Sequence, residues 1–218
     1  MAIATDAFID TGSAFSSATS KTWSHTCTGS NLILFEGHFI TVAADRTTGV
    51  TYAGSAMTRV NTIVSTPTTQ ADLWYIIAPS TGANNIVISF SASSTCSAAS
   101  GSYTGAKQSS QPDASNTGTV VSGTTLAVST TTVADNSWVL MYVREDAGLM
   151  TVGANTTYRS GYTAYGSQFV DRNLAATPAG SVTLNMTLNA TTNAGGLTAS
   201  IAPFVVAATT GPAMLLTF

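Results

Sequence analysis

Apolar and polar residues alternate in short runs along most of this chain of 218 residues, and helical periodicity is nearly absent. The clearest run lies late in the sequence, where Val182, Leu184, Met186 and Leu188 alternate with threonine and asparagine. Such alternation gives a strand one buried face and one face in water. Runs of this kind predict strands at 21–28, 31–43, 49–53, 56–65, 70–78, 84–91, 96–104, 124–130, 137–144, 149–153, 166–174, 181–188 and 197–207.

Clusters of Gly, Pro, Asn and Ser separate these runs, as expected for an all-β chain. The polar stretch 105–123 is long enough to cross between two sheets. We therefore predict an all-β, two-sheet antiparallel sandwich of jelly-roll or Greek-key type. Because no Pro- or Gly-rich linker divides the chain, we expect an N-terminal arm (1–20), one sandwich domain (21–207) and an apolar C-terminal tail (208–218).

Charge is scarce, with 8% charged residues and a formal net charge of −3. Since no block of Lys or Arg exists, we expect no nucleic-acid partner. The segment Met1–Asp6 lacks the basic and apolar regions of a signal peptide, and no apolar run reaches about 18 residues. We expect a protein without signal peptide or membrane partner, made in the cytosol.

The ionisable residues do not suggest a reaction. His25, Glu36 and His38 are close in sequence, and on a strand Glu36 and His38 share a face. A catalytic pair would also need a nucleophile and an oxyanion donor within reach, and the sequence points to neither, so we expect a structural role. Isolated aspartates at strand ends, such as Asp135 and Asp171, are more typical of turn caps than of calcium ligands. We predict no enzymatic activity, no metal and no cofactor.

Cys27 and Cys96 lie on separate predicted strands. They are either two buried free thiols or, if those strands are neighbours, the two halves of a disulfide. The three tryptophans, Trp23, Trp74 and Trp138, stand within β-branched runs, so we expect them to be largely buried.

The most distinctive local segment spans residues 158–169. Tyr158, Tyr162, Tyr165 and Phe169 are interleaved there with Gly and Ser. Tyrosine offers a ring for stacking and a hydroxyl for hydrogen bonding, which suits a sugar or a protein interface. The alternative is a loop tucked over the open edge of the sandwich.

The tail is apolar beyond Gly211 and Pro212, with Met214, Leu215, Leu216 and Phe218 as further candidate interface residues. Pro lacks an N–H for a ladder and Gly permits a turn, so the preceding strand should break here. The tail is then either a last strand on its own sheet or a segment that docks on a neighbouring subunit.

Several phrases together resemble a β-sandwich module of tailed-phage virion proteins and of some bacterial surface proteins. They are Trp23-Ser24-His25-Thr26, Val50–Thr58, Ser102–Ala106, Asp135–Val139 and Pro178–Thr183. The resemblance runs from about residue 20 to residue 207, and it implies a jelly-roll-like fold without catalytic residues. The tail departs from that module.

We therefore expect a virion structural protein, assembled in the host cytoplasm, most simply a capsid decoration (cement) protein or another head or tail subunit. Its partners would be other copies of itself and a major capsid or tail protein. Two alternatives remain open. One is a carbohydrate-binding, host-attachment module with a glycan as its partner, and the other is a surface-filament subunit joined by an exchanged strand.

Overall fold

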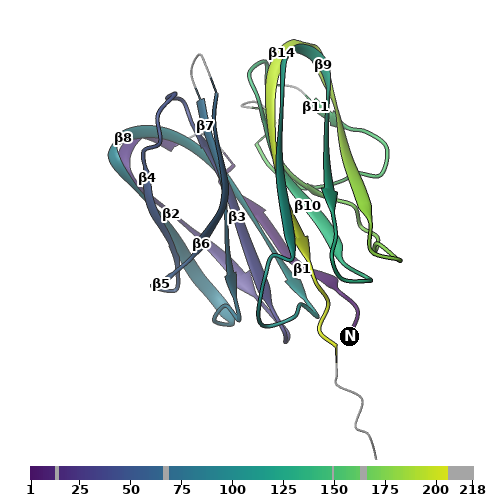
Figure 1. Ribbon diagram of the computed structural model, residues 1–218. Helices are drawn as coiled ribbons and strands as arrows, with labels where there is room; N and C mark the ends of the chain where they lie inside the picture. The colour runs from purple at the N-terminus through teal and green to yellow at the C-terminus, as the bar shows by residue number, and fades with distance from the viewer. Residues whose placement is uncertain (13–14, 66–68, 149, 163–165, 206–218) are drawn as a thin grey trace, which may run out of the picture.

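The computed structural model describes residues 1–12, 15–65, 69–148, 150–162 and 166–205, and every regular element in them is a β-strand. The strands are β1 (Ala4–Asp10), β2 (Phe15–Cys27), β3 (Ile33–Ile40), β4 (Thr47–Tyr52), β5 (Ser55–Ala56), β6 (Thr58–Ser65), β7 (Thr69–Ile77), β8 (Gly82–Thr104), β9 (Ala114–Thr131), β10 (Trp138–Glu145), β11 (Met150–Val152), β12 (Thr157–Ser160), β13 (Ser167–Asp171) and β14 (Ser181–Ile201). They form two antiparallel sheets (Figure 1), which confirms the all-β, two-sheet prediction.

The first sheet is organised around the long strand β8. Its order is β5-β4-β8-β3-β7-β6, and β1 and β2 pair with β8 as well. The early part of β8 pairs with β2 and β4, whereas its late part pairs with β1 and β3. The pairing changes between Phe90 and Cys96, where β8 arches over at the top of Figure 1. One strand therefore belongs to two layers, and the sheet folds back on itself.

The second sheet repeats this plan. Its order is β11-β14-β10-β13-β12, with β9 also paired to β14. These five strands correspond, in that order, to β4, β8, β3, β7 and β6 of the first sheet, and corresponding strands follow one another in the same order along the chain. β14 changes partners between Leu188 and Ala194, as β8 does at its own bend. Asn31 and Asn136, each two residues before β3 and β10, share a positive φ of 50° and 63°. The chain thus consists of two halves with one topology, β1–β8 and β9–β14.

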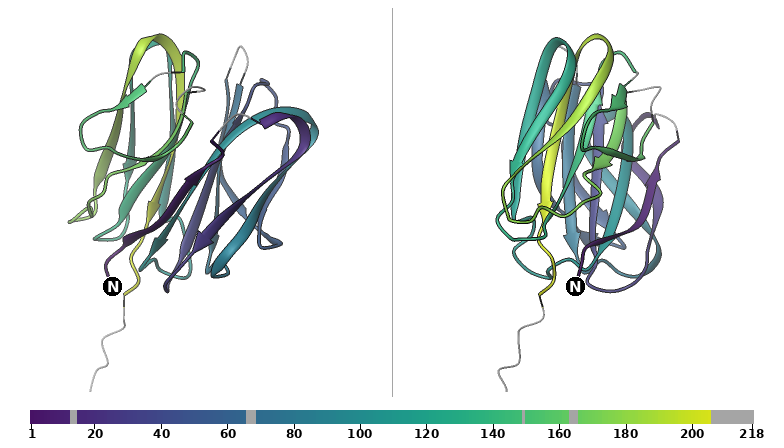
Figure 2. Two further views of the ribbon diagram at one scale, coloured as in Figure 1. Left: turned by 180° about the vertical axis from the view of Figure 1, so that it is seen from behind. Right: turned by 90° about the vertical axis from the view of Figure 1, so that its right-hand side faces the viewer.

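Three apolar clusters follow from this arrangement. A central core lies between the halves, with Phe35, Phe39, Leu140, Tyr142 and Phe169 among its buried residues. Each half also encloses a core of its own, because alternate residues of β3 and β10 point away from the central core. Figure 2 shows the two folded sheets side by side from behind in its left view, and the second half in front of the first in its right view.

The halves contact each other along the strands that face the central core. β6 of the first half packs against β9 of the second, and the counterpart of β6, β12, packs against β1. At the centre, Gly37 and Tyr142 occupy equivalent positions on β3 and β10, and a Cβ on Gly37 would stand 2.3 Å from Cγ of Tyr142. The missing side chain of Gly37 makes room for the ring of Tyr142.

The two ends of the described chain, Met1 and Val205, lie at the side of the molecule opposite to the arches (Figure 1). The amino group of Met1 donates a hydrogen bond of 2.7 Å to the carbonyl oxygen of Phe204. Residues 105–113 form the connection between the halves, and the amide of Phe204 also bonds to the carbonyl of Gly105 in it. This end therefore gathers both ends of the described chain and the link between the halves.

Individual strands differ from the sequence predictions in a consistent way. Two pairs of predicted strands, 84–91 with 96–104 and 181–188 with 197–207, are each one bent strand. The predicted arm 1–20 contains β1 and the start of β2, and the predicted crossing 105–123 becomes β9 from Ala114 onward. The candidate tail residues Met214, Leu215, Leu216 and Phe218 lie outside the described residues.

Candidate functional site

Glu36 and His38 share the face of β3 that points into the core of the first half, and both are fully buried. His38 Nδ1 donates to the Glu36 carboxylate at 3.1 Å, and Nε2 lies 2.9 Å from the hydroxyl of Thr47. Asp72, on the neighbouring strand β7, completes the cluster because its Oδ2 lies 3.1 Å from Nε2. The imidazole thus stands between two buried carboxylates.

Further polar groups extend this cluster toward the surface. The Gln70 amide donates to Asp72 at 2.6 Å and to Asp45 at 2.9 Å. Arg59, on β6, holds Asp45 with two hydrogen bonds and approaches Asp72 at 3.5 Å. The cluster therefore continues from the buried histidine to an exposed ion pair at the surface.

The charge states follow from these contacts. Burial alone would lower the pKa of His38, but the charge of Glu36 and the hydrogen bonds to Asp72 and Glu36 outweigh it and raise the pKa to about 10. Burial likewise opposes ionisation of Asp72, yet its hydrogen bond to His38 and the charge of that imidazole lower its pKa. Burial raises the pKa of Glu36, against the attraction of His38. At neutral pH the centre is a buried imidazolium paired with Asp72.

His25 lies in the same core and has the opposite charge state. Burial lowers its pKa to about 4, against the charge of Asp6, so the ring is neutral at pH 7. The Ser102 hydroxyl donates to Asp6 at 2.7 Å, which leaves its oxygen to accept from His25 Nε2 at 3.0 Å. His25 Nδ1 then accepts from Ser100 at 2.8 Å.

A serine, a histidine and an aspartate in one chain of hydrogen bonds can suggest nucleophilic catalysis. Ser100 and Ser102 are fully buried, however, and His25 is 1% exposed, so a substrate has no access to either hydroxyl. Among the described residues, no group of three or more His, Cys, Asp and Glu side chains is arranged to hold a metal ion. Both buried clusters serve the interior of the first half.

The segment 158–169 is not a continuous aromatic surface. Tyr158 is 44% exposed and donates to the carbonyl of Gly161, and Tyr162 is half-buried, whereas Phe169 is fully buried in the central core. Tyr165 lies outside the described residues. Of the three candidate side chains described, only the two tyrosines reach the surface.

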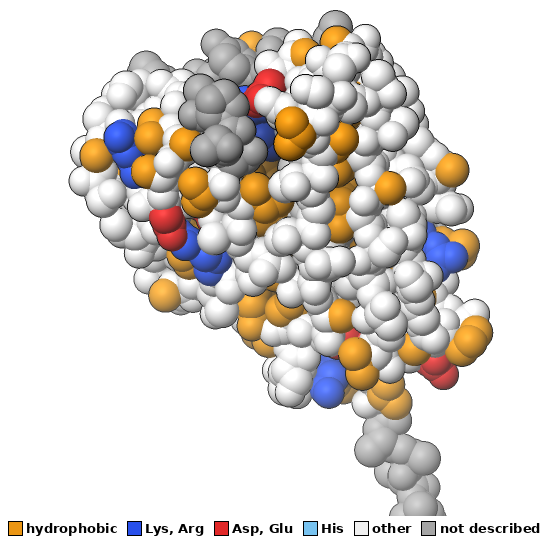
Figure 3. Space-filling view, turned by 45° about the horizontal axis from the view of Figure 1, so that its top comes forward, with side chains coloured by type: hydrophobic (Ala, Val, Ile, Leu, Met, Phe, Trp, Pro, Cys, Tyr) orange, Lys and Arg blue, Asp and Glu red, His pale blue; other side chains and the backbone are white. Residues whose placement is uncertain are grey.

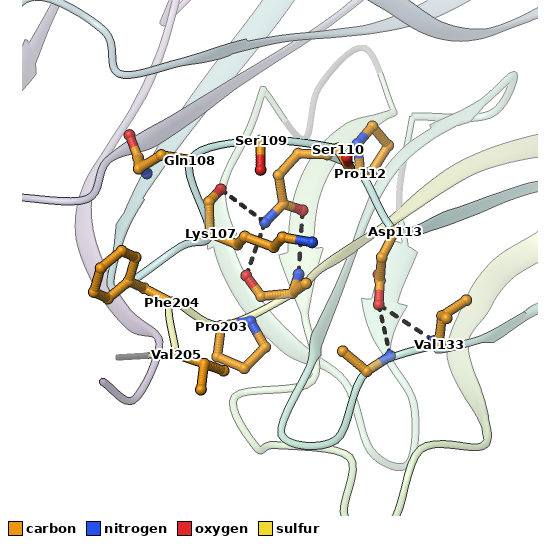
Figure 4. A pocket seen from close by; sticks show the side chains of 13 residues that line it. Lys107, Gln108, Ser109, Ser110, Pro112, Asp113, Val133, Pro203, Phe204 and Val205 are labelled. Carbon is orange, nitrogen blue, oxygen red and sulfur yellow. Dashed lines mark hydrogen bonds between the residues drawn. The ribbon is translucent and has the colours of Figure 1, made fainter. Parts of the chain in front are cut away.

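A wide hollow lies at the end of the molecule where the two ends of the described chain meet. Its volume is about 880 Å³, and it is lined by the connection 107–113, by Val133 and Ala134, and by 202–205. The Gln111 amide fixes its floor by donating to the carbonyls of Lys107 and Ala202. Figure 4 shows Phe204, Pro203 and Val205 along one side, Asp113 and Val133 along the other, and Lys107 between them.

This end of the molecule exposes apolar side chains. Val133 and Val205, both lining the hollow, are 72% and 76% exposed. A second hollow of about 410 Å³, lined by Met1, Trp138 and Ala175 among others, shares the segment Pro203–Val205 with the first. Asp113 holds the far rim in place by accepting hydrogen bonds from the amides of Val133 and Ala134 and from the Ser137 hydroxyl. The two hollows and their exposed apolar side chains together form an apolar end of the molecule, and hydrogen bonds hold the loops that carry them in place.

The outer layers differ from this end, because small uncharged polar residues dominate them. The outward positions of the outer layers are Ser20, Thr22, Ser24, Thr26, Thr51, Asn85, Val87 and Ser89 in the first half, and Thr125, Ala127, Ser129, Thr131, Thr151, Ser181, Thr183, Asn185 and Thr187 in the second. None of these side chains is ionisable. Figure 3, with the arches brought toward the viewer, shows few charged side chains on a mostly white surface, and some of them lie as adjacent blue and red pairs.

Sequence reasoning found Glu36, His38 and His25 but missed their partners Asp72, Gln70, Ser100 and Ser102. The available signal was polar residues at inward positions of apolar strands, as in Gln70-Ala71-Asp72-Leu73.

Cys27 and Cys96 are free, buried thiols, and of the three tryptophans only Trp74 is buried, while Trp23 and Trp138 are partly buried. The hollow was not foreseen, because its lining comes from three distant segments.

Comparison with known proteins gives no relative. No family model, no curated protein and no solved structure matches this chain. Within the described residues, no helix is long and apolar enough to cross a membrane.

Proposed function

We propose that this protein is a structural subunit of a virion, such as a capsid decoration protein or another head or tail subunit. The observation that carries the proposal is the lack of charge on the outer layers of both halves. Closely packed copies of a highly charged protein repel one another, whereas uncharged Ser/Thr/Asn faces can pack side by side without that cost. The apolar end supplies a second surface suited to contact with another chain.

The rest of the described structure supports a mechanical role. Both histidines and the serines bonded to His25 are buried, so the ionisable clusters stabilise the interior and are not presented to a substrate. A subunit of this kind stabilises a particle through the surface area that is buried between subunits, and stable assemblies use interfaces of roughly 2,000 Å² or more. The partners would be other copies of the chain and a major capsid or tail protein.

The proposal is tested in two stages with the full chain. Analytical ultracentrifugation across a wide concentration range should reveal self-association that changes little with added salt, because the contacts are uncharged. Cryo-EM and mass spectrometry of virus particles from the source of the sequence should then locate the chain in the particle. A protein that stays monomeric, is absent from particles and is retained on polysaccharide would overturn the proposal in favour of a carbohydrate-binding module.

A further inference from the structure

We propose that the hollow lined by residues 107–113, 133–134 and 202–205 is a receptor for the apolar segment Ala213–Phe218 of a second copy of this chain. The inference rests on the proposed structural function and specifies the contact through which copies join. Each subunit would offer a hollow and a tail, so the contact is heterologous and can extend from copy to copy.

The hollow has the properties of a receptor for apolar side chains. Its volume of about 880 Å³ lies within the range of sites that bind ligands of moderate size. Its rim carries the exposed side chains of Val133 and Val205, together with Phe204. Gln111 and Asp113 fix its walls by hydrogen bonds to backbone groups, so the hollow exists before any occupant arrives.

The tail has matching chemistry. Residues 206–218 contain no ionisable side chain, and Met214, Leu215, Leu216 and Phe218 stand within five positions. Four such side chains in water are unfavourable, and their burial drives association in proportion to the apolar area removed from water. Among the described residues that line the hollow, Lys107 is the one cation and Asp113 the one carboxylate, so the lining carries no net charge toward an uncharged segment.

The length of the chain beyond Val205 allows the tail to reach a hollow on another copy. The described chain ends at Val205, on the rim of the hollow, and Leu216 lies eleven residues further on. Eleven residues reach at most about 36 Å from Val205, which is far enough for Leu216 to arrive at the hollow of a neighbouring copy.

Disulfide trapping distinguishes the two hollows. We would prepare full-length Val133→Cys and Leu216→Cys variants separately, mix them under mild oxidation and look for a mixed dimer by non-reducing electrophoresis and peptide mass spectrometry. Cys27 and Cys96 are fully buried and do not compete. The matched control is Val121→Cys mixed with Leu216→Cys, because Val121 is 77% exposed but lies on β9, away from the hollow.

We expect a disulfide that joins the Val133→Cys chain to the Leu216→Cys chain, and none above background with the control. A bond that forms only within one chain carrying both substitutions would show that the tail fills its own hollow, and it would overturn the proposal. Equal trapping at positions 133 and 121 would overturn it as nonspecific association. If ultracentrifugation shows assembly but no specific bond forms, the receptor is wrong while the structural function stands. If the protein neither assembles nor cross-links, both are wrong.

A second variant tests the energetic role of the tail. Leu216→Asp should weaken self-association by about tenfold to a hundredfold, because a charge replaces a buried leucine. Thr217→Asp introduces the same charge one position away on a residue that the proposal does not require to be buried, and it should have a smaller effect. Equal effects of the two substitutions would contradict insertion of Leu216. Circular dichroism checks that both variants fold.

Discussion

The two halves of this protein share one strand order and differ in what their interiors contain. In the first half, β3 places Glu36 and His38 in the core, paired with Asp72. β3 and β10 begin two residues after equivalent asparagines, so the matching positions of the second half are Met141 and Val143, both in an apolar cluster. The same topology therefore encloses either a charged network or an ordinary hydrophobic core.

The difference shows which features specify the fold. Alternation along the strands, the turns and the bends of β8 and β14 are common to both halves, whereas the chemistry of the interior is not. A buried charge is tolerated where it is partnered, and in the first half Thr47 and Gln70 add hydrogen bonds to the ion pair. Removing part of such a network should cost more than trimming an apolar core, while replacing it completely should cost little.

The largest effect should come from His38→Ala, which leaves Glu36 and Asp72 buried without their imidazolium. We expect a loss of about 3–5 kcal/mol in the free energy of unfolding, measured by urea denaturation at pH 7. The matched control is Val143→Ala in the second half, which removes only apolar contacts and should cost about 1–3 kcal/mol. Equal losses at the two positions would mean that the charged network behaves as an ordinary core.

The pH dependence should be the next largest effect, and it should originate in the first half, where both histidines of the chain lie. The pKa of His25 falls from 6.5 to about 4 on folding, so the unfolded chain binds a proton that the folded protein does not. Stability should therefore fall by roughly 3 kcal/mol as the pH drops from 6.5 to 4. His25→Gln should remove most of this slope, and a slope that persists would assign it to other groups.

The pKa of His38 is raised from 6.5 to about 10, which gives the opposite sign. Its stabilisation is complete below pH 6.5 and is lost as the pH rises through 10. Denaturation curves between pH 7 and 10 should therefore show declining stability.

Gly37→Ala probes the packing between the halves. Its new Cβ would stand 2.3 Å from Tyr142, so ring or backbone must shift, at a cost of about 1–3 kcal/mol. Gly49→Ala in β4 is the matched control, because nothing lies within 4 Å of a Cβ there, and its stability should change little. Partly buried Trp138 packs on the central core and should report the disturbance by fluorescence. Unchanged stability in Gly37→Ala would show that the central core is loosely packed.

The smallest effect should come from transplanting the interior of the second half. A triple variant, Glu36→Met, His38→Val and Asp72→Gln, installs the residues found at the equivalent positions 141, 143 and 168. We expect stability at pH 7 within about 1 kcal/mol of the natural protein, because desolvation of the charges is removed together with their attraction. The decline between pH 7 and 10 should be reduced. A loss as large as that of His38→Ala would show that the network is required for this fold.

The sequence predicted most strands because alternation is a local property. It did not reveal that 84–91 and 96–104 form one strand, because the bend of β8 is defined by its partners on either side. The repeat of strand order was equally hidden, since the halves share apolar positions and turn residues more than particular side chains. β1 was missed because its seven residues include two aspartates and show little alternation of buried and exposed positions. The first part of β9 was missed because its Ser, Thr and Asn residues resemble loop sequence.

The candidate sites were less predictable than the strands, because their residues come together through contacts between distant parts of the sequence. The face shared by Glu36 and His38 followed from spacing, but Asp72 joins them through the pairing of β3 with β7. Phe169 was grouped with nearby tyrosines by sequence distance, although strand alternation directs it to the central core. The hollow is assembled from residues near 110, 133 and 204, which no local pattern connects.

The bond between Met1 and the carbonyl of Phe204 has a consequence for chain order. In a variant without residues 206–218, a short peptide could join Val205 to Met1, and new ends could be opened in the connection near Ser109 and Ser110, which lies outside the strands. The resulting circular permutant would begin with the second half and end with the first, while keeping every strand pairing. Its ends would still emerge at the same pole of the molecule, so the pole from which a fused segment departs is set by the fold rather than by the order of the halves.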